Sequence, residues 1–421
     1  MRVLVIAYEF PPIIAAQSLR WFYLTQELAR IGVEVHVLCP SFPALEGLHP
    51  VIFEPGIVLH RVWPGPFVGL SQWLVRATRS NAITGASDTG NIQPFFLRSY
   101  RLTRKLLDHL LFPDLRTEWY PFARRRLHRL LIDYRFDAMI SSHEPGVDLL
   151  LGLWAQKQFK VKWIADLGDP ILTPYSPGWR RKIDTQFESR ILRQADSVLL
   201  TNDWVKRLLC DRHRFTDVSN KLICIPQGFP EHLPFGHSET SLLSTGVMNI
   251  VFTGTFYRDF RSPLQFALAL RDMNADDIMM TAIGDNLDFI PIFKDISNIR
   301  FLGKINHFEC LAAQREADLL LNIGNLQSYQ VPGKIFEYLG AAKPILHIKT
   351  SEDDIGANLV QELNAGLVVK NDRIAIKTGL QHLLELWRNH RLTQSFPPNF
   401  AAIAQYSWSA RAKDLLQLLT R

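Results

Sequence analysis

The residues from Gln330 to Pro344, QVPGKIFEYLGAAKP, combine side chains that can hold an anion and a sugar. Pro332 suits the first position of a helix, where its missing N–H costs nothing. The N–H groups after it point out of the helix end and, together with the helix dipole, favour a phosphate. Lys334 adds a positive charge there, and Glu337 shares its helix face and can accept hydrogen bonds from vicinal hydroxyls, such as those of a ribose. The same spacing fits an ordinary surface pair worth about 0.3 kcal/mol, and the local pattern leaves both interpretations open.

Three more polar residues stand at the ends of apolar runs that predict strands. His143 follows FDAMISS, and Asp166 and Asp169 lie at and just beyond the end of VKWIAD. Because ligands bind outside the carboxyl ends of parallel strands, we expect these side chains to face a ligand. The aspartates could accept protons or hydrogen bonds from hydroxyl groups. A structural role is the alternative for His143, and Asp169 could instead cap the turn before Pro170.

Two series of strands would have to position these residues. VLVIAY (3–8) predicts a buried parallel strand, and a helical spacing from Leu19 to Leu28 followed by VEVHVL (33–38) completes a βαβ unit. Further strands of this series are expected at 136–142, 161–166, 197–202 and 221–226. After a polar stretch, a second series is expected at 248–254, 278–284, 299–303, 318–324 and 344–349. The sequence therefore predicts an α/β protein with two Rossmann-like domains that face a cleft.

The expected domain limits follow from this restart of the strand pattern. We expect an N-terminal domain over residues 1–227, a C-terminal domain over 228–400, and a helix over 401–421. A mobile basic insertion is expected around 65–130, because 80–95 is polar and small and the residues after it alternate arginine-rich and apolar clusters. Such a basic amphipathic surface can lie on an anionic membrane. Solvated helices whose arginines face water are the alternative.

Composition excludes several classes of protein. The chain has 421 residues, which suits two domains, and no apolar run approaches the roughly 18 residues needed to span a bilayer. The N-terminus does not resemble a signal peptide, and four separated cysteines (Cys39, Cys210, Cys224 and Cys310) suggest neither a disulfide framework nor a zinc site, so we expect a cytoplasmic protein. The net charge is +6, and residues 1–225 hold 29 Lys+Arg against 21 Asp+Glu. Without a nucleic-acid motif, this basic half favours an anionic membrane or substrate over nucleic acid.

Several segments, taken in order, resemble the retaining GT-B glycosyltransferases of family four. The helix start at 330–344 resembles the donor-site helix of that family. The loop YEFPP with Arg20, the segments FDAMISSHEP and ADLGDP, the turn GFP, and the segments VFTGTFYRDFRSP and READLLLNIG resemble other family segments in the same order. The matches cover about 1–45 and 135–345.

The resemblance implies a nucleotide-diphospho-sugar donor in the second domain, no divalent metal or other cofactor, and a last helix that crosses back to the first domain. Glu337 would bind the ribose, while Lys334, Gly333 and the helix start would face the diphosphate or the sugar. The implied catalytic residues are His143, near the donor sugar or the acceptor, Lys334, and Arg258 and Arg261, which would neutralise the leaving diphosphate. The other implied donor-binding residues are Ala15, Ala16, Gly254, Thr255 and Tyr329. Arg20, Asp166 and Asp169 would lie on the acceptor side.

The sequence departs from the family pattern at two places. Tyr329 stands eight positions before Glu337, where the family usually has another glutamate, and a phenol cannot supply a carboxylate. Ala15 and Ala16 replace a Gly-Gly pair, so their methyl groups restrict the approach of the backbone to a phosphate. In the family branch that ADLGDP resembles, an arginine stands where this chain has Gly168.

The resulting hypothesis is a glycosyltransferase that moves a sugar to a hydroxyl of a glycan or lipid-linked acceptor in cell-surface polysaccharide synthesis. Its expected location is the cytoplasm, with peripheral contact to the inner face of the membrane. Two alternatives remain open: a sugar-nucleotide epimerase of the same shape, and a degenerate non-catalytic protein that binds a nucleotide or a glycan.

Overall fold

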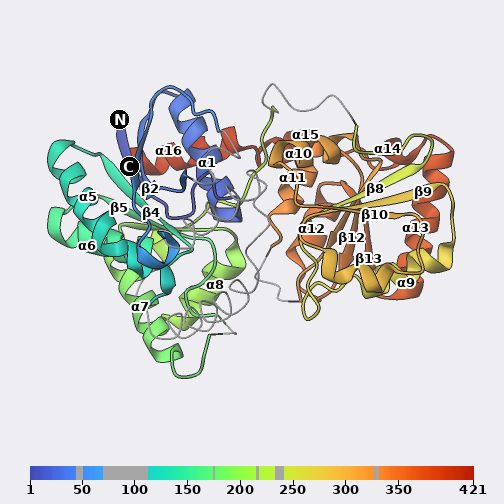
Figure 1. The fold of residues 1–421 in the computed structure, drawn as a ribbon, viewed down its shortest axis with the longest axis horizontal. Helices are drawn as coiled ribbons and strands as arrows, with labels where there is room; N and C mark the ends of the chain where they lie inside the picture. Colours follow the sequence, from blue (N-terminus) through green and yellow to red (C-terminus); the bar gives the residue numbers. More distant parts are fainter. Residues whose placement is uncertain (44–50, 70–111, 174–175, 215–217, 233–240, 327–330) are drawn as a thin grey trace, which may run out of the picture. The chain divides into compact units, whose positions relative to one another are not determined.

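The computed structural model describes residues 1–43, 51–69, 112–173, 176–214, 218–232, 241–326 and 331–421. The chain forms two compact units: Met1–Pro226 together with Ala412–Arg421, and Gln227–Arg411. The break after Pro226 lies one residue from the expected limit at 227, and the last ten residues group with the first unit. Figure 1 follows the chain through both units.

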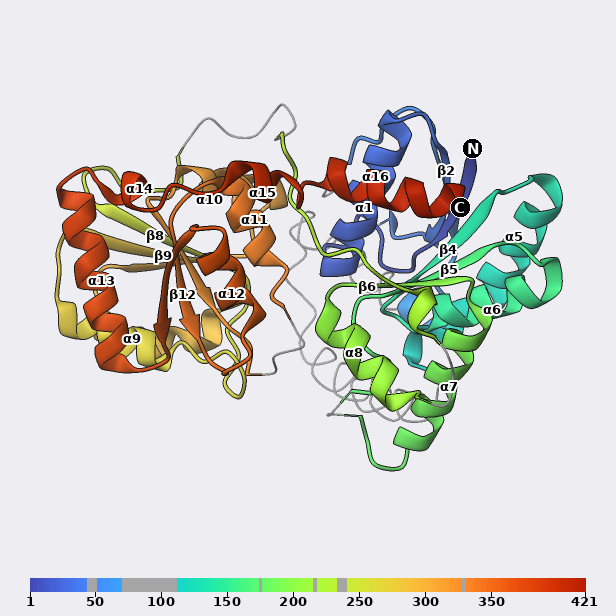
Figure 2. The same ribbon diagram turned by 180° about the vertical axis from the view of Figure 1, so that it is seen from behind.

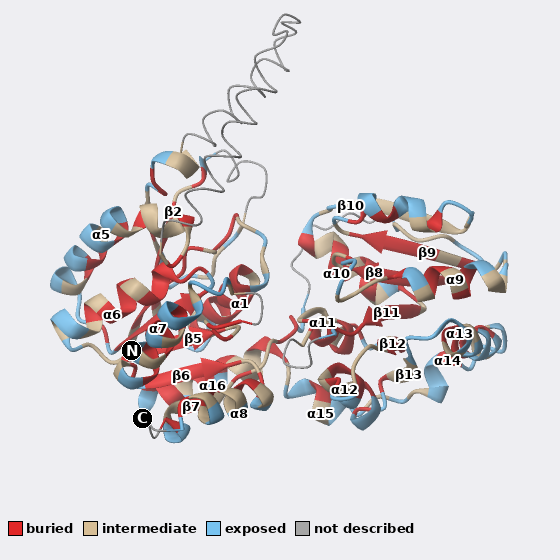
Figure 3. Ribbon diagram, turned by 90° about the horizontal axis from the view of Figure 1, so that it is seen from below, coloured by how far each residue is buried: buried red, intermediate tan, exposed pale blue. Residues whose placement is uncertain are grey.

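The first unit is built on a parallel sheet of seven strands in the order β3-β2-β1-β4-β5-β6-β7. Its strands are β1 (Arg2–Ile6), β2 (Glu34–Pro40), β3 (Ile57–Val62), β4 (Ala138–His143), β5 (Trp163–Leu167), β6 (Ser197–Leu200) and β7 (Leu222–Cys224). Every residue of β4, β5 and β6 is buried, as expected for central strands covered by helices on both faces. Figure 3 shows β5 and β6 among the buried parts of the unit.

Helices connect these strands. They are α1 (Ala16–Arg30), η1 (Leu115–Trp119), α5 (Tyr120–Asp133), α6 (Val147–Phe159), α7 (Arg181–Gln194), α8 (Asp203–Arg212) and η2 (Ser219–Lys221). The start of α8 is capped by Asn202, whose side chain accepts a hydrogen bond from Val205 N. The α5 helix turns Ala123, Leu127 and Leu130 inward. This spacing gives the helix one apolar face, so packing rather than propensity holds it on the sheet.

The second unit is built on a parallel sheet of six strands in the order β10-β9-β8-β11-β12-β13. Its strands are β8 (Met248–Thr253), β9 (Ile278–Ile283), β10 (Ile299–Gly303), β11 (Leu319–Ile323), β12 (Ile345–Lys349) and β13 (Gly366–Lys370). Its helices are α9 (Leu264–Met273), η3 (Leu287–Phe293), α10 (His307–Glu316), α11 (Lys334–Ala341), α12 (Ile355–Glu362), α13 (Arg373–Arg388), α14 (Leu392–Ser395) and α15 (Phe400–Ala404). Two clusters of buried apolar side chains stabilise the unit, one around Phe252 and Phe256 and the other around Ile335 and Leu339.

The predicted α/β class is confirmed: both sheets are parallel and Rossmann-like. The strands β3 and β13 were not predicted from the sequence. Residues 115–130, expected within a mobile insertion, form η1 and most of α5. Residues 70–111, which include the polar stretch 80–95, lie outside the described residues.

The C-terminal segment forms α15 and α16 (Trp408–Thr420) instead of one helix over 401–421. The last residues of α16 belong to the first unit, and Figure 2 shows this helix there from behind. Lys162 Nζ donates to the carbonyls of Leu418 (3.0 Å) and Leu419 (3.2 Å). A cation at the last helical carbonyls satisfies acceptors that have no partner within the helix.

Candidate functional site

Each sheet reverses its strand order at one point, and several of the predicted site residues that the structure describes lie at these two points. In the second unit the reversal lies between β8 and β11, and in the first unit between β1 and β4. Ligands of open α/β sheets bind at the carboxyl ends of the strands at such a point. Gly254 to Arg261 follow β8, and Lys334 and Glu337 lie on the helix after β11. His143 ends β4, and Ala15 and Ala16 precede and begin the helix after β1.

In the second unit, Lys334 and Glu337 form an ion pair at the start of α11. Lys334 Nζ lies 3.0 Å from Glu337 Oε1 and 2.8 Å from Oε2. Gln314 of α10 donates to the same Oε2 at 3.0 Å. The glutamate side chain is 11% exposed, so it is held in place and still reached from outside. A carboxylate has about four acceptor positions, and these three hydrogen bonds leave one for a ligand.

A network of buried hydrogen bonds holds this ion pair in place. Gln314 Nε2 also donates to Thr253 Oγ1 at 3.0 Å, at the end of β8. The Tyr338 hydroxyl accepts from Thr253 N at 2.8 Å. Gln314 and Tyr338 are almost fully buried. The network therefore joins α10, α11 and the end of β8 and orients Glu337.

The electrostatics keep the pair charged. Burial alone would lower the pKa of Lys334, but the Glu337 carboxylate outweighs burial and raises that pKa above its ordinary value. Burial would likewise raise the pKa of Glu337, but the Lys334 charge, with smaller contributions from His307 and the hydrogen bonds, holds the pKa below its ordinary range. Burial lowers the pKa of the nearby His307 to about 4, so this imidazole is neutral near pH 7.

The loop after β8 is held by two amide side chains. Asn286 accepts from Phe256 N at 2.8 Å and donates to the carbonyl of Gly254 at 2.8 Å. Gly254 has φ +133°, a conformation that favours glycine, and Asn286 fixes that turn. Asn325, after β11, accepts from Arg261 Nη2 at 2.7 Å and from Nε at 3.0 Å. The two loops at the reversal point are thereby joined.

The predicted donor-side residues therefore occupy different settings. Burial lowers the pKa of Arg261, whose guanidinium is pinned by Asn325, whereas Arg258 is exposed. Thr255 and Gly254 are half-buried in the same loop. Gly333 is the N-cap of α11, which has no side-chain cap. Tyr329 lies outside the described residues.

In the first unit, His143 is 7% exposed at the end of β4. Its Nδ1 atom is buried and has no hydrogen-bond partner within the described ranges. The Gln17 side chain donates to its backbone carbonyl. Ala15 is the N-cap of α1, in extended conformation and without a side-chain cap, and Ala16 is exposed. This end of the sheet thus presents a helix start and an imidazole.

Arg20 and Asp166 do not present their charges to solvent. Both side chains are 0% exposed, and Arg20 Nε and Nη2 reach the two Asp166 oxygens at 3.0 and 3.1 Å. Arg20 also donates to the carbonyl of Pro226 at 3.0 Å, and Trp21 Nε1 donates to Asp166 at 3.0 Å. The geometry gives this pair a positioning role between α1 and β5, in place of the direct acceptor contact that we expected.

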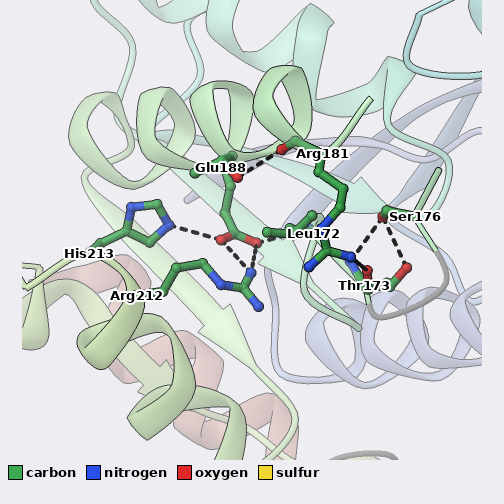
Figure 4. Close-up of polar contacts among 8 residues, drawn as sticks. Leu172, Thr173, Ser176, Arg181, Glu188, Arg212 and His213 are labelled. Atoms are coloured by element: carbon green, nitrogen blue, oxygen red, sulfur yellow. Dashed lines mark hydrogen bonds and ion pairs between the residues drawn. The ribbon is translucent and has the colours of Figure 1, made fainter. Parts of the chain in front are cut away.

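Asp169 is half-buried in the loop after β5, and the buried Glu188 anchors the continuation of this loop. Glu188 accepts from Leu172 N (3.1 Å), from Arg212 (2.7 Å) and from His213 (2.8 Å), as Figure 4 shows. Burial would raise the pKa of Glu188, but His213 and Arg212 hold it below its ordinary value. Glu188 therefore holds the segment at Leu172 against α7 and α8, which restrains the loop that begins at the end of β5.

Two further carboxyl groups, on the segments that follow and contact the end of β4, were not predicted from the sequence. Asp114 accepts from Gly146 N at 3.0 Å, and Asp148 accepts from Tyr8 N at 2.8 Å. Burial raises the pKa of both carboxyls above the ordinary value. Asp148 is the second residue of α6, the helix that follows β4. A carboxyl group at the start of the helix after a strand was the sequence signal that could have identified it.

The described residues contain neither a candidate metal site nor a candidate membrane-spanning helix. No group of three or more His, Cys, Asp or Glu side chains there is arranged to hold a metal ion. No helix in the same ranges is long and apolar enough to cross a membrane.

Comparison with known proteins adds a family match for part of the chain. Residues 18–218 match the model described as Glycosyl transferase 4-like domain. No curated protein sequence matches the chain significantly.

Solved structures share the whole fold. HepE of Anabaena, in complex with UDP and glucose, is 14% identical with a TM-score of 0.64, covering 100% of this chain and 99% of that one. Sucrose-phosphate synthase of Thermosynechococcus elongatus is 14% identical with a TM-score of 0.62, covering 99% and 98%. WaaG, a glycosyltransferase involved in lipopolysaccharide biosynthesis, is 12% identical with a TM-score of 0.59, covering 98% and 99%. The chain therefore has the GT-B fold of two Rossmann-like domains, and its residues 18–218 match the Glycosyl transferase 4-like domain.

Proposed function

We propose that the protein is a glycosyltransferase that moves a sugar from a nucleotide-diphospho-sugar to a hydroxyl group of a glycan or lipid-linked acceptor, with retention of the anomeric configuration. The observation that carries the proposal is the Lys334–Glu337 pair at the start of α11, oriented by Gln314 at the reversal point of the second sheet. This site lies outside the segment that matches the family model, so it supports the proposal independently.

The proposed donor site assigns one task to each group. Glu337 accepts a hydrogen bond from a ribose hydroxyl through its remaining acceptor position. The diphosphate gains negative charge as the glycosidic bond of the donor breaks. This charge is stabilised by Arg261, Arg258 and the positive end of the α11 dipole. Because these groups belong to the chain, the proposed mechanism requires no divalent cation.

The first unit supplies the acceptor side in this proposal. In this proposal His143 contacts the donor sugar or the acceptor hydroxyl, and Asp169 is the carboxyl group that accepts a proton or a hydrogen bond. The acceptor is a growing surface polysaccharide or its lipid-linked precursor. WaaG, which shares the fold, is a glycosyltransferase involved in lipopolysaccharide biosynthesis.

A thermal-shift screen of nucleotide sugars, read together with Glu337→Gln, tests the donor site. A donor at 100 times its dissociation constant should stabilise the protein by about 2.7 kcal/mol. Glu337→Gln should weaken binding of that donor by about 10–100-fold, since a hydrogen bond to a charged group contributes about 1.5–3 kcal/mol. Glu385→Gln, an exposed glutamate on α13, is the matched control and should bind like the wild type.

Turnover then separates transfer from binding alone. The wild-type protein should release free nucleotide slowly from the donor found in the screen, and Glu337→Gln should release less. A donor that binds but is never turned over, even with candidate acceptors present, would support the non-catalytic alternative. No shift with any common donor would reject the donor-site assignment.

A further inference from the structure

The outer face of the first unit carries a second feature that the proposed transfer reaction does not use. A hollow of about 470 Å³ lies between α5 and α6. Its lining includes Tyr120, Arg124, Arg125, His128, Arg129 and Trp154. All but Trp154 belong to α5, and Trp154 lies in the middle of α6. The hollow is therefore formed by the helical layer that covers the sheet.

The sequence of α5 accounts for the position of the hollow. Tyr120, Arg124 and His128 are four residues apart and form one row along the helix. Arg125 and Arg129 form a second, adjacent row. The inward positions Ala123, Leu127 and Leu130 lie on the other side of the helix, so both rows face away from the core.

The charges of the three arginines in the hollow are the next feature of the site. Within the part of the chain that the structure describes, no carboxylate forms an ion pair with Arg124, Arg125 or Arg129. Arg124 lies over the ring of Trp154, with its guanidinium carbon 5.0 Å from the ring centroid. Many other arginines of the structure pair with carboxylates, for example Arg373 with Asp272 and Arg388 with Asp277. Three cations that have no ion-pair partner among the described residues lie on one concave surface, and they attract an anion.

We propose that this hollow is a binding site for a phosphate-bearing anion. Guanidinium groups match phosphate oxygens with two parallel hydrogen bonds, and phosphate is the anion that best uses several of them at once. The rings of Tyr120 and Trp154 give an apolar wall for the group that carries the phosphate. The proposal does not depend on the glycosyltransferase function.

Inorganic pyrophosphate is titrated calorimetrically into the full chain at low ionic strength. The isotherms are fitted with two sites because the proposed donor site also binds a diphosphate, and the comparison of variants concerns the site that the hollow provides. The double variant Arg125→Gln/Arg129→Gln should weaken pyrophosphate binding at least about tenfold, because it removes two charge-assisted contacts. Lys182→Gln/Arg190→Gln is the matched control, since it removes the same charge from exposed positions of α7 in the same unit. The control should bind like the wild type, and circular dichroism melts establish that all three proteins are folded.

Vesicles distinguish the two sources of such a phosphate. Co-sedimentation with phosphatidylcholine vesicles, with and without phosphatidylglycerol, is compared across the same three proteins. If only the Arg125→Gln/Arg129→Gln variant loses binding to anionic vesicles, the ligand is a lipid headgroup. If it loses only pyrophosphate, the ligand is a soluble phosphate. Equal losses in both double variants, unchanged binding in Arg125→Gln/Arg129→Gln, or no binding by the wild type to either probe would overturn the proposal.

Discussion

Amide side chains, more than charges, position the loops at the reversal point of the second sheet. Asn286 is 1% exposed and connects two backbone groups of the loop after β8 through its oxygen and its nitrogen. Asn325 restrains Arg261 in the same region. A guanidinium held in this way loses less rotamer entropy when an anion binds, which favours affinity.

Asn286→Ala should destabilise the second unit and weaken binding of the donor. The substitution leaves the N–H of Phe256 and the carbonyl of Gly254 without partners in a buried setting, at a cost of about 1–3 kcal/mol each. Urea denaturation followed by donor titration measures both effects. Asn298→Ala removes a single hydrogen bond to the Ala275 carbonyl at the opposite, amino-terminal end of the strands. If Asn298→Ala weakens donor binding as strongly as Asn286→Ala does, Asn286 does not position the donor-side loop.

Single residues were predictable from sequence where a strand end or a helix start placed them. Glu337, Lys334 and His143 lie at the expected kinds of position, because helix spacing and strand ends are local properties. Gln314 and Asn286 were missed, since their partners are 23 and 30–32 residues away in sequence. Arg20 and Asp166, 146 residues apart, also showed no sign in the sequence that they neutralise one another.

At the scale of elements, a chain of hydrogen bonds ties α5 to the edge of the first sheet. Arg126 lies 3.0 Å from His60 Nδ1, and since arginine only donates, that nitrogen accepts. His60 Nε2 therefore carries the hydrogen and donates to His36 Nδ1 at 2.9 Å. His36 Nε2 in turn donates to Glu34 Oε1 at 2.9 Å. This order requires both imidazoles to be neutral.

The free energy of unfolding should fall between pH 6.5 and about pH 4 because of this chain. Burial, with His36 and Arg126, lowers the pKa of His60 to about 4. In the unfolded chain a histidine binds a proton near pH 6.5, so acid favours unfolding by up to about 1.4 kcal/mol per pH unit across this window. Glu34, Arg2 and Tyr134 are the other titratable or charged groups that face the chain.

Urea denaturation at pH 7 and pH 5 checks this pH dependence by comparing variants. His60→Gln should reduce the loss of stability between the two pH values. His382→Gln, at an exposed position of α13, should keep the loss of the wild type. An unchanged pH dependence in His60→Gln would show that the histidine chain does not control it.

The loop after β5 should depend on the Glu188 anchor. Glu188→Gln removes the charge that pairs with Arg212 and His213, and breaking a buried pair costs about 3–5 kcal/mol. The lowered pKa of Glu188 also predicts how this stabilisation depends on pH. The stabilisation is present above the ordinary glutamate pKa and is lost as acid protonates the carboxylate. Proteolysis near Leu172 should accelerate in Glu188→Gln and not in Glu352→Gln, whose side chain is 98% exposed.

Central strands were predictable as elements, whereas only two of the four edge strands, β7 and β10, were predicted. The strands β1, β4 and β5 are buried on both faces and so stand out as apolar runs. The strands β3 and β13 lie at the ends of their sheets and are only partly buried, with charged residues among their apolar ones. Their weaker pattern did not separate them from loops, although pairing completes both sheets.

At the scale of the whole molecule, the chain returns to its first unit at the end. Ala412, Leu415, Leu418 and Leu419 of α16 are buried, although the preceding 185 residues, Gln227–Arg411, form the other unit. The last residues therefore complete a core that was begun about 400 positions earlier. This arrangement makes the stability of the first unit sensitive to the C-terminus.

Leu415→Ala should loosen the first unit and leave the second unchanged. Leu415 is 0% exposed, and removing such a side chain typically costs about 2–5 kcal/mol. Hydrogen–deuterium exchange should speed up in β5, which follows the Lys162 contact to α16, and stay constant in β8 of the other unit. Gln417→Ala, at an exposed position of the same helix, should change neither strand. Equal deprotection of β5 and β8 in Leu415→Ala would mean that the two units unfold as one cooperative body, contrary to the division of the chain found here.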